Sequence, residues 1–406
     1  MTQSAAITAS TLDPQPLTVE QLLARADELL PAIGAGSATR ERDRQLPFDA
    51  VRQIAEALLY TVRIPVRYGG PGGSVRDVIG LLIRIASVDS NVAQALRPGF
   101  GFVEGLLASS AEGAEQERHR WFERYLQGAV LGNAGWEVGG ANGAISARIV
   151  ADGEHYRANG SKFYSTGSLY ADWISAVALD KDDQPVSFIL PRGREGLELL
   201  DDFDAMGQRL TASGTTRLKD VKVYANEIRT RTVEEGKRTI VTPFLQLFLA
   251  SVQAGIARNA LNDAVTFAQQ HARPIKHSSA EKSVDDPYVE LSVGEISARA
   301  YTAQAVVLSA ADAIDRAWAS GLDPAAVDQA AIEVAQAQYI AAESALKAAE
   351  RVFDVGGAST TGRGHNLDRH WRNARTVANH NPRDWKAAAV GAWQLKGTPP
   401  PTSGLF

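Results

Sequence analysis

Cysteine is absent from the 406 residues of this chain. Its absence excludes disulfides, thiolate metal ligands, iron–sulfur ligation and a cysteine nucleophile, and it suits the reducing cytoplasm. Long apolar runs are lacking too. The longest candidate, 241–256, is interrupted by two glutamines and a glycine, and it falls short of the roughly 20 residues that cross a bilayer. We therefore expect a cytoplasmic protein with no membrane segment.

An excess of positive charge is also lacking. Lysine and arginine together number 42 against 47 aspartates and glutamates, and no basic stripe follows the chain. Binding to a phosphate backbone depends on such a stripe, so we expect no nucleic-acid partner. The seven histidines form no HxH or HxxxH pair, and the spacing of His365 and His370 does not put them on one helix face. No metal site is therefore expected.

The sequence does contain an ordered change of periodicity. Apolar residues recur at three- and four-residue steps from 18 to 127, alternate with polar residues from 128 to 237, and return to helical spacing from 238 to 406. Residues 1–17 are rich in Ser, Thr, Ala and Pro, which predicts a disordered tail. This order predicts an α+β fold with an N-terminal helical domain, a middle antiparallel β-domain and a C-terminal helical domain.

Turn and helix signals refine this division. Asp152-Gly153 and Asn159-Gly160 are both strong signals for hairpin turns between strands of the middle domain. The C-terminal domain contains three long segments rich in Ala, Leu and Val and one shorter segment, which together predict a four-helix bundle. These segments are 244–271, 288–320, 325–353 and 382–395.

Four motifs carry a resemblance to a known family. They are Ile64–Gly73, the Asn-Gly-Ser-Lys-Phe-Tyr-Ser-Thr-Gly block at 159–167, the stretch Met206–Gly214, and Gly356-Gly357. Together they make the chain, from about Leu22 to Gly391, similar to the acyl-CoA dehydrogenase superfamily. The resemblance implies the same helix–sheet–helix fold, a homotetramer, and a flavin held between the middle sheet and the C-terminal bundle.

The resemblance also implies which residues hold the flavin. Tyr164 would stack near the ring, with Ser165 beside it, and the Thr166 hydroxyl would donate a hydrogen bond to the flavin edge near its reactive nitrogen, tuning the cofactor. Arg273 would reach a flavin phosphate from the neighbouring subunit, a task that suits a guanidinium. A second set would serve the phosphate of either FMN or FAD. This set is Gly356, Gly357, Ser359 and Thr360.

A carboxylate is missing where a dehydrogenase of this family needs one to remove a substrate proton. No Asp or Glu occurs between Arg369 and Arg383, and none occurs between Glu235 and Asp263. Without its base such a reaction loses about 10²–10⁴-fold in rate. The missing acid argues against an acyl-CoA dehydrogenase. That activity, with an unrecognised base, and a non-catalytic scaffold without flavin remain as alternatives.

The region of the missing acid carries His380 instead. This pattern resembles the two-component flavin monooxygenases that include dibenzothiophene monooxygenase. The likeness implies reduced FMN, supplied by a separate flavin reductase, with FAD as the alternative, and oxygenation through a flavin C4a-hydroperoxide. His380 would protonate or hold that peroxide, since imidazole both donates and accepts near neutrality. Asn133 would line the same pocket.

The identity of the substrate stays open, because two residues expected to face it differ from those of dibenzothiophene monooxygenase. Gln94 and Pro98 stand where dibenzothiophene monooxygenase has a histidine and a tyrosine. The expected substrate is therefore a small molecule, either an organosulfur compound, another heteroatom compound or an aromatic one.

Overall fold

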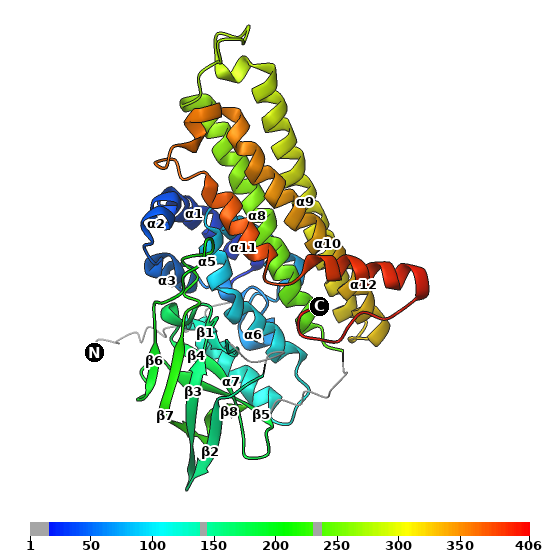
Figure 1. The fold of residues 1–406 in the computed structure, drawn as a ribbon. Coiled ribbons are helices and arrows are strands. Elements are labelled where there is room, and N and C mark those ends of the chain that lie inside the picture. Colours follow the sequence, from blue (N-terminus) through cyan, green and yellow to red (C-terminus); the bar gives the residue numbers. More distant parts are fainter. Residues whose placement is uncertain (1–15, 139–143, 230–237) are drawn as a thin grey trace, which may run out of the picture.

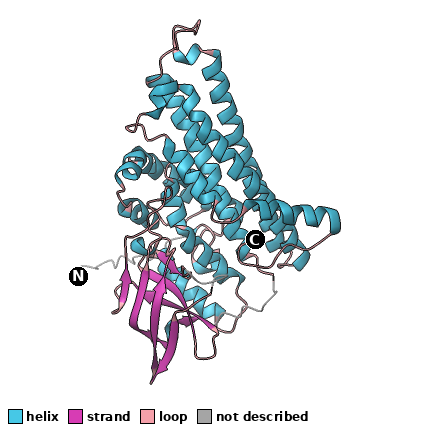
Figure 2. Cartoon of the chain, in the orientation of Figure 1, coloured by secondary structure: helices cyan, strands magenta, loops and turns pink. Residues whose placement is uncertain are grey.

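The structure, a computed structural model, describes residues 16–138, 144–229 and 238–406. Most of the tail predicted for 1–17 lies outside the described residues, which begin at residue 16. Residue 237, where the middle β-domain was expected to end, also lies outside them. The expected α+β order is confirmed. Helices come first, a sheet follows, and long helices close the chain (Figures 1 and 2).

Seven helices precede the sheet in the described part of the chain. Polar caps fix where two of them begin. The Thr18 hydroxyl accepts from the Gln21 N–H while the Gln21 side chain accepts from the Thr18 N–H, and Ser74 and Asp77 form the same reciprocal pair. The helices are α1 (Val19–Ala35), α2 (Ser37–Asp43), α3 (Phe48–Glu56), α4 (Val75–Ala86), α5 (Ser90–Ala95), α6 (Arg97–Ala108) and α7 (Ala114–Leu126).

The middle of the chain forms one sheet, with the strand order β6-β7-β3-β2-β4-β5-β8 and with β1 paired to β4. Most pairings are antiparallel, as expected. The exceptions are both made by β4, which runs parallel to β1 and, at the pair Arg148 and Leu179, parallel to β2. The strands are β1 (Leu131–Ala134), β2 (Arg148–Asp152), β3 (His155–Lys162), β4 (Trp173–Leu179), β5 (Pro185–Pro191), β6 (Leu197–Leu199), β7 (Thr216–Tyr224) and β8 (Ile228–Arg229).

One of the two predicted hairpin turns is wrong. Asp152-Gly153 does begin the turn between β2 and β3, where Asp152 pairs with His155. Asn159-Gly160 instead lies inside β3, at a register shift against β7. Gly160 has φ +151 there, and a Cβ on it would overlap Ala147. The glycine therefore serves a bulge and a close backbone approach, which are the other uses of glycine in a strand.

The C-terminal bundle is built from α8 (Val241–Gln270), α9 (Pro287–Ala319), α10 (Pro324–Arg351) and α11 (Asp368–Ala378). The segment expected to complete it, 382–395, forms α12 (Arg383–Lys396), which packs on α10 and points away from the bundle (Figure 1). The prediction of the fourth helix was therefore wrong. The chain turns out of the bundle after α11, where the Asn381 side chain donates to Gln246 Oε1 on α8.

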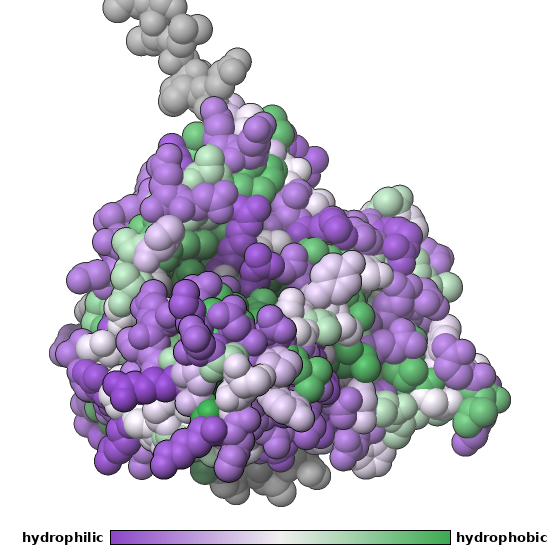
Figure 3. Space-filling model, turned by 90° about the horizontal axis from the view of Figure 1, so that it is seen from above, coloured by the Kyte–Doolittle hydropathy of each residue, from purple (hydrophilic) through white to green (hydrophobic). Residues whose placement is uncertain are grey.

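The first long helix of the bundle also forms the junction with the N-terminal helices. α4, α5 and α6 all pack against α8. Gly255 permits this approach, because a Cβ on it would overlap Ala86 of α4. Seen from above, hydrophobic residues show in hollows between hydrophilic rims (Figure 3). Within the ranges that the structure describes, no helix is long and apolar enough to cross a membrane.

Candidate active site

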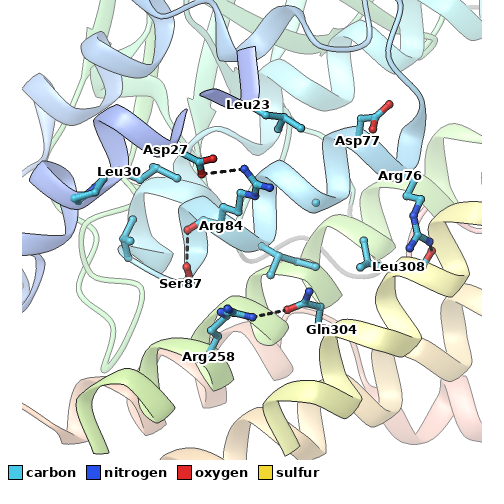
Figure 4. Close-up of a pocket in the computed structure, with 14 residues that line it drawn as sticks. Leu23, Asp27, Leu30, Arg76, Asp77, Arg84, Ser87, Arg258, Gln304 and Leu308 are labelled. Atoms are coloured by element: carbon cyan, nitrogen blue, oxygen red, sulfur yellow. Dashed lines mark hydrogen bonds and ion pairs between the residues drawn. The ribbon is translucent and has the colours of Figure 1, made fainter. Parts of the chain in front are cut away.

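A groove of about 600 Å³ opens between α1, α4, α8 and α9 (Figure 4). Its charged groups already have partners: Arg84 pairs with Asp27 at 2.9 Å, and Arg258 donates to Gln304 Oε1 at 3.0 Å. None of the residues that the sequence assigns to chemistry lines this groove. The candidate site lies elsewhere, where the turn after β3 meets the helices.

Thr166 lies in that turn, which the backbone holds tightly against α5. The Thr166 N–H donates to the Tyr164 carbonyl at 2.8 Å, and the Thr166 carbonyl accepts from the Asn133 N–H of β1 at 3.2 Å. Gly167 follows with φ +75, and a Cβ on it would overlap the carbonyl of Ala95 at the end of α5. The structure thus brings Thr166, Asn133 and the end of α5 together.

A chain of hydroxyls fixes the direction of the Thr166 hydroxyl. The Thr211 hydroxyl lies 2.9 Å from the Gln208 carbonyl, which can only accept, so Thr211 donates there. Ser213 Oγ lies 2.7 Å from Thr211 Oγ1 and must therefore donate to it. Thr166 Oγ1, 2.9 Å from Ser213 Oγ, must in turn donate to Ser213. In this direction of the hydroxyl chain Thr166 gives its hydroxyl proton to Ser213 and keeps its lone pairs to accept, whereas the sequence led us to expect a donor to the flavin.

Three polar atoms around this turn have no hydrogen-bond partner within the described ranges. Ser165 Oγ belongs to a fully buried residue, Gln94 Oε1 to one that is 6% exposed, and Asn133 Oδ1 is itself buried. Buried polar atoms in native proteins are nearly always bonded. Unpartnered polar atoms on residues around a tight turn therefore fit a polar ligand such as the edge of a flavin ring.

His380 lies in the short loop between α11 and α12. Its neighbour Asn381 is anchored on Gln246 of α8, which also accepts from Gln338 at 3.3 Å. His380 is an exposed residue, although protein atoms surround part of its side chain. That burial, together with the positive charge of Arg97, lowers the pKa of His380 to about 4. The imidazole is therefore neutral at pH 7.

The junction of α5 and α6 joins the Thr166 turn to His380. Ala95 ends α5 against Gly167, and two residues later the charge of Arg97 acts on His380. Gln94 and Pro98, the two positions expected to face substrate, flank this junction and are buried and half-buried. Sequence reasoning did not single out Arg97, because a lone arginine carries no local motif.

The Met206–Gly214 stretch, which the sequence showed as a motif without a role, contacts α5, α11 and the Thr166 turn. Gly207 lies against α11, where a Cβ would overlap the Arg372 carbonyl. The Gln208 side chain donates to Ser90 Oγ of α5 at 3.1 Å. Since the same stretch carries Ser213, one loop links α5, α11 and the Thr166 hydroxyl.

The residues expected to bind the flavin phosphate lie near the C-terminal end of α8. Gly356 packs on Phe267, and Gly357 follows with φ +55. The Ser359 hydroxyl donates to the Gly356 carbonyl at 2.7 Å, and the Thr360 hydroxyl donates to the Gly357 carbonyl at 2.6 Å. Their hydroxyl protons are thus engaged with the backbone, and their oxygens keep lone pairs.

Two expected flavin contacts are exposed. Arg273 comes three residues after α8, whose C-terminal end lies at the end of the bundle far from the sheet (Figure 1). It is exposed and makes no ion pair with any residue that the structure describes. Within one chain the structure does not bring it to Thr166. Tyr164 is 54% exposed, with its ring 4.9 Å from that of Phe163 and 6.5 Å from that of Phe203. It lies beside Thr166 and is open to a ligand.

A carboxylate reaches α11 from α8, but it is already paired. Asp263 Oδ2 lies 2.6 Å from the Arg369 guanidinium and 2.8 Å from His370 Nε2. Burial alone would raise the pKa of Asp263, yet the hydrogen bond from His370 and the charge of Arg369 hold it well below its usual range. An ionised carboxylate bound in this way is a poor proton acceptor for a substrate. No cluster of three or more metal-ligating side chains occurs in 16–138, 144–229 or 238–406.

Comparisons with known proteins show the family of this chain. Residues 247–385 match the family described as acyl-CoA dehydrogenase, C-terminal domain. The chain is similar to the probable FMNH2-dependent monooxygenase SfnC of Pseudomonas putida, with 30% identity over 87% of this chain and 89% of SfnC.

Solved structures of flavin-dependent monooxygenases share the fold of this chain. FMN-bound TdsC from Paenibacillus sp. A11-2, a dibenzothiophene monooxygenase, has a TM-score of 0.87 and 28% identity, over 95% of this chain and 100% of TdsC. Methanesulfinate monooxygenase MsuC from Pseudomonas fluorescens has a TM-score of 0.83 and 26% identity, over 95% of this chain and 99% of MsuC. The resemblance drawn from the sequence motifs is confirmed, and the chain belongs to the flavin-dependent monooxygenase branch of the acyl-CoA dehydrogenase superfamily.

Proposed function

We propose that this chain is a monooxygenase that uses reduced FMN and O2 to add one oxygen atom to a small organosulfur or aromatic substrate. One oxygen atom enters the substrate and the other leaves as water, while reduced FMN is oxidised to FMN. Reduced flavin supplies the two electrons that activate O2. SfnC is named as FMNH2-dependent, TdsC binds FMN, and TdsC binds indole together with FMN.

The observation that carries the proposal is the direction of the Thr166 hydroxyl. Its proton is committed to Ser213, so towards a ligand Thr166 can only accept. Reduced flavin has an N–H at its reactive nitrogen, whereas oxidised flavin has a lone pair there. An acceptor at that position therefore favours the reduced cofactor, the form that an oxygenase takes up from a separate reductase.

His380 and Asn133 supply the remaining polar groups. A neutral imidazole donates from one ring nitrogen and accepts at the other. His380 can therefore give a proton to a developing oxygen anion, or hold an oxygen by hydrogen bonding, without carrying a charge itself. The Asn133 Oδ1, buried without a partner, is an acceptor for a ring N–H or for a substrate donor. In this arrangement Gln94 and Pro98 would contact the substrate.

The remaining assignments concern cofactor and assembly. Tyr164 and Ser165 would contact the flavin ring, and Gly356, Gly357, Ser359 and Thr360 its phosphate. Arg273 would reach the phosphate of a neighbouring subunit, which supports a homotetramer because Arg273 lies far from Thr166 of its own chain. A separate flavin reductase and a cytoplasmic location belong to the same proposal, as do domains at 18–127, 128–237 and 238–406. FAD is the alternative cofactor.

The test is rapid mixing of the full chain, loaded with reduced FMN, with O2-saturated buffer. We expect hydrogen peroxide release to be delayed in the wild type and immediate in His380→Ala, because the imidazole no longer retains the activated oxygen. Asn379→Ala, the exposed neighbouring residue, is the matched control and should behave like the wild type. Immediate release from all three proteins would refute the proposal.

A second measurement addresses the dehydrogenase alternative. The chain with oxidised flavin is mixed with acyl-CoA thioesters under anaerobic conditions, and flavin absorbance is followed. No bleaching is expected, because Asp263 is bound to Arg369 and His370. Rapid bleaching would instead identify a dehydrogenase.

A further inference from the structure

Arg97, the first residue of α6, carries a charge that no described residue neutralises. Its side chain makes neither an ion pair nor a hydrogen bond within 16–138, 144–229 or 238–406, and its Nε is buried. Arg84 on α4, by contrast, pairs with Asp27 at 2.9 Å. An enclosed guanidinium without a counter-charge is costly, so the fold keeps it at the expense of stability.

The surroundings of Arg97 place it in the candidate active site. Gln94, one helical turn before it, is buried with an unpartnered Oε1. Arg97 itself is half-buried, so part of its side chain remains accessible to a ligand. Burial lowers the pKa of Arg97 to about 10, which leaves it charged at pH 7. That charge is close enough to lower the pKa of His380.

The packing of α6 on α8 explains this proximity. Gly101, one turn after Arg97, lies against Leu245, where a Cβ would contact the leucine side chain at 2.6 Å. The next residue of α8, Gln246, is the one that anchors Asn381. The first turns of α6 and the loop carrying His380 therefore flank the same turn of α8.

We propose that Arg97 binds the oxyanion head group of a small anionic substrate, such as a sulfinate, sulfonate or carboxylate, and so selects charged molecules for oxygenation. This inference rests on the proposed function and narrows its substrate class. The planar guanidinium fork matches two oxygens of such a group. For a sulfinate, one atom of O2 forms the new S–O bond of a sulfonate and the other becomes water. Reduced flavin provides the two electrons and two protons.

The flavin phosphate is a different anion, and other residues are available for it. Arg273, Ser359 and Thr360 lie towards the far end of α8, whereas Arg97 lies beside His380. The position of Arg97 therefore favours binding of an anionic substrate over binding of the flavin phosphate. The experiment below distinguishes these two ligands.

Calorimetry on the full chain with bound oxidised FMN tests the inference, using benzenesulfonate and the neutral, similarly shaped methyl phenyl sulfone. We expect benzenesulfonate to bind at least about tenfold more tightly, since one charged hydrogen-bonded pair contributes that much or more. Arg97→Met should remove this preference, and Arg97→Lys should keep part of it. Arg84→Met, which removes a paired arginine of the groove in Figure 4, is the matched control and should leave the preference intact.

Equal affinity for the two probes, or a preference that survives in Arg97→Met, would overturn the inference. FMN and riboflavin titrations complete the design. Arg97→Met should bind both flavins as the wild type does, which also shows that it folds. Weaker binding of FMN alone would mean that Arg97 holds the flavin phosphate, and the inference would fall. A chain that delays peroxide release but shows no anion preference refutes this inference and leaves the proposed function standing. Anion preference without delayed release refutes the proposed function, and with it the role in oxygenation, and leaves only an anion-binding site at Arg97.

Discussion

The Gln208 N–H donates a 2.6 Å hydrogen bond to the Asn373 side-chain carbonyl, and both residues are buried. This bond joins the loop before β7 to α11. The loop also carries Ser213, which receives the Thr166 proton, while α11 leads into His380. The two halves of the candidate site are therefore joined by this buried bond, by the 3.0 Å hydrogen bond that Arg372 donates to the Met206 carbonyl, and by the packing around them.

Asn373→Ala should weaken the fold and the site together. The substitution leaves the Gln208 N–H buried without an acceptor, which costs about 1–3 kcal/mol in the free energy of unfolding. Urea unfolding measures this loss, and flavin titration should show weaker binding. Asn262→Ala, on an exposed face of α8, is the control and should change stability by less than about 0.5 kcal/mol. Equal stabilities for the two variants would refute the role of the bond.

Ser213→Ala should change which redox form of flavin is preferred. Without Ser213 the Thr166 hydroxyl proton is free to turn outwards, so Thr166 can donate to the unprotonated nitrogen of oxidised FMN. We expect the ratio of dissociation constants, oxidised over reduced, to fall by about three- to tenfold, as one neutral hydrogen bond predicts. Anaerobic and aerobic titrations measure it. Ser187→Ala in β5 is the control, and an unchanged ratio in both variants would contradict the hydroxyl chain.

Much of this architecture could be predicted because it is local. The segment 288–320 was predicted as a helix, and the structure has it at Pro287–Ala319, since a composition rich in Ala, Leu and Val is a property of the segment itself. The hairpin turn predicted at Asn159-Gly160 was wrong because the conformation of these two residues is not decided locally. Their pairing with β7, more than fifty residues away, decides their conformation, and a turn signal does not contain that information.

The residues of the candidate site also differ in how far the sequence could predict them. Thr166 and His380 were found because their neighbours form motifs. The role proposed for Arg97 could not be predicted, since it depends on the lack of an ion-pair partner among the residues that the structure describes. The direction of the Thr166 hydroxyl depends on two side chains in another loop. The paired state of Asp263 likewise required α8 and α11 to be placed side by side.

Arg273→Ala should lower flavin affinity without changing stability. Arg273 is exposed and has no ion-pair partner in the described part of the chain, so its removal costs the isolated fold little. If it binds a phosphate across a subunit interface, losing the charged contact should weaken FMN binding by about tenfold or more, measured by calorimetry. Riboflavin, which lacks the phosphate, should be unaffected. Lys276→Ala in the same loop is the control, and unchanged FMN affinity would refute the assignment.

Asp263→Asn should be strongly destabilising. Arg369 is buried, and removing the carboxylate leaves its charge without a counter-charge, which costs about 3–5 kcal/mol. The control is Asp312→Asn. Its partner Arg76 is nearly half exposed, and breaking such a surface pair costs about 0–1 kcal/mol. Denaturant unfolding of both variants checks the difference, and similar losses would show that the Asp263 cluster is not a buried ion pair.

His380 should titrate at an unusually low pH because burial and the charge of Arg97 both disfavour its imidazolium. Its pKa of about 4 in the folded chain lies below the roughly 6.5 of an unfolded histidine. The unfolded chain therefore binds the proton first, and this residue lowers stability as the pH falls from about 6.5 to 4. Arg97→Met removes a positive neighbour and should raise the pKa of His380, observed by NMR titration of its ring protons. Arg84→Met should leave it unchanged. A fall in the pKa, or no shift in Arg97→Met, would mean that the two side chains do not share one site.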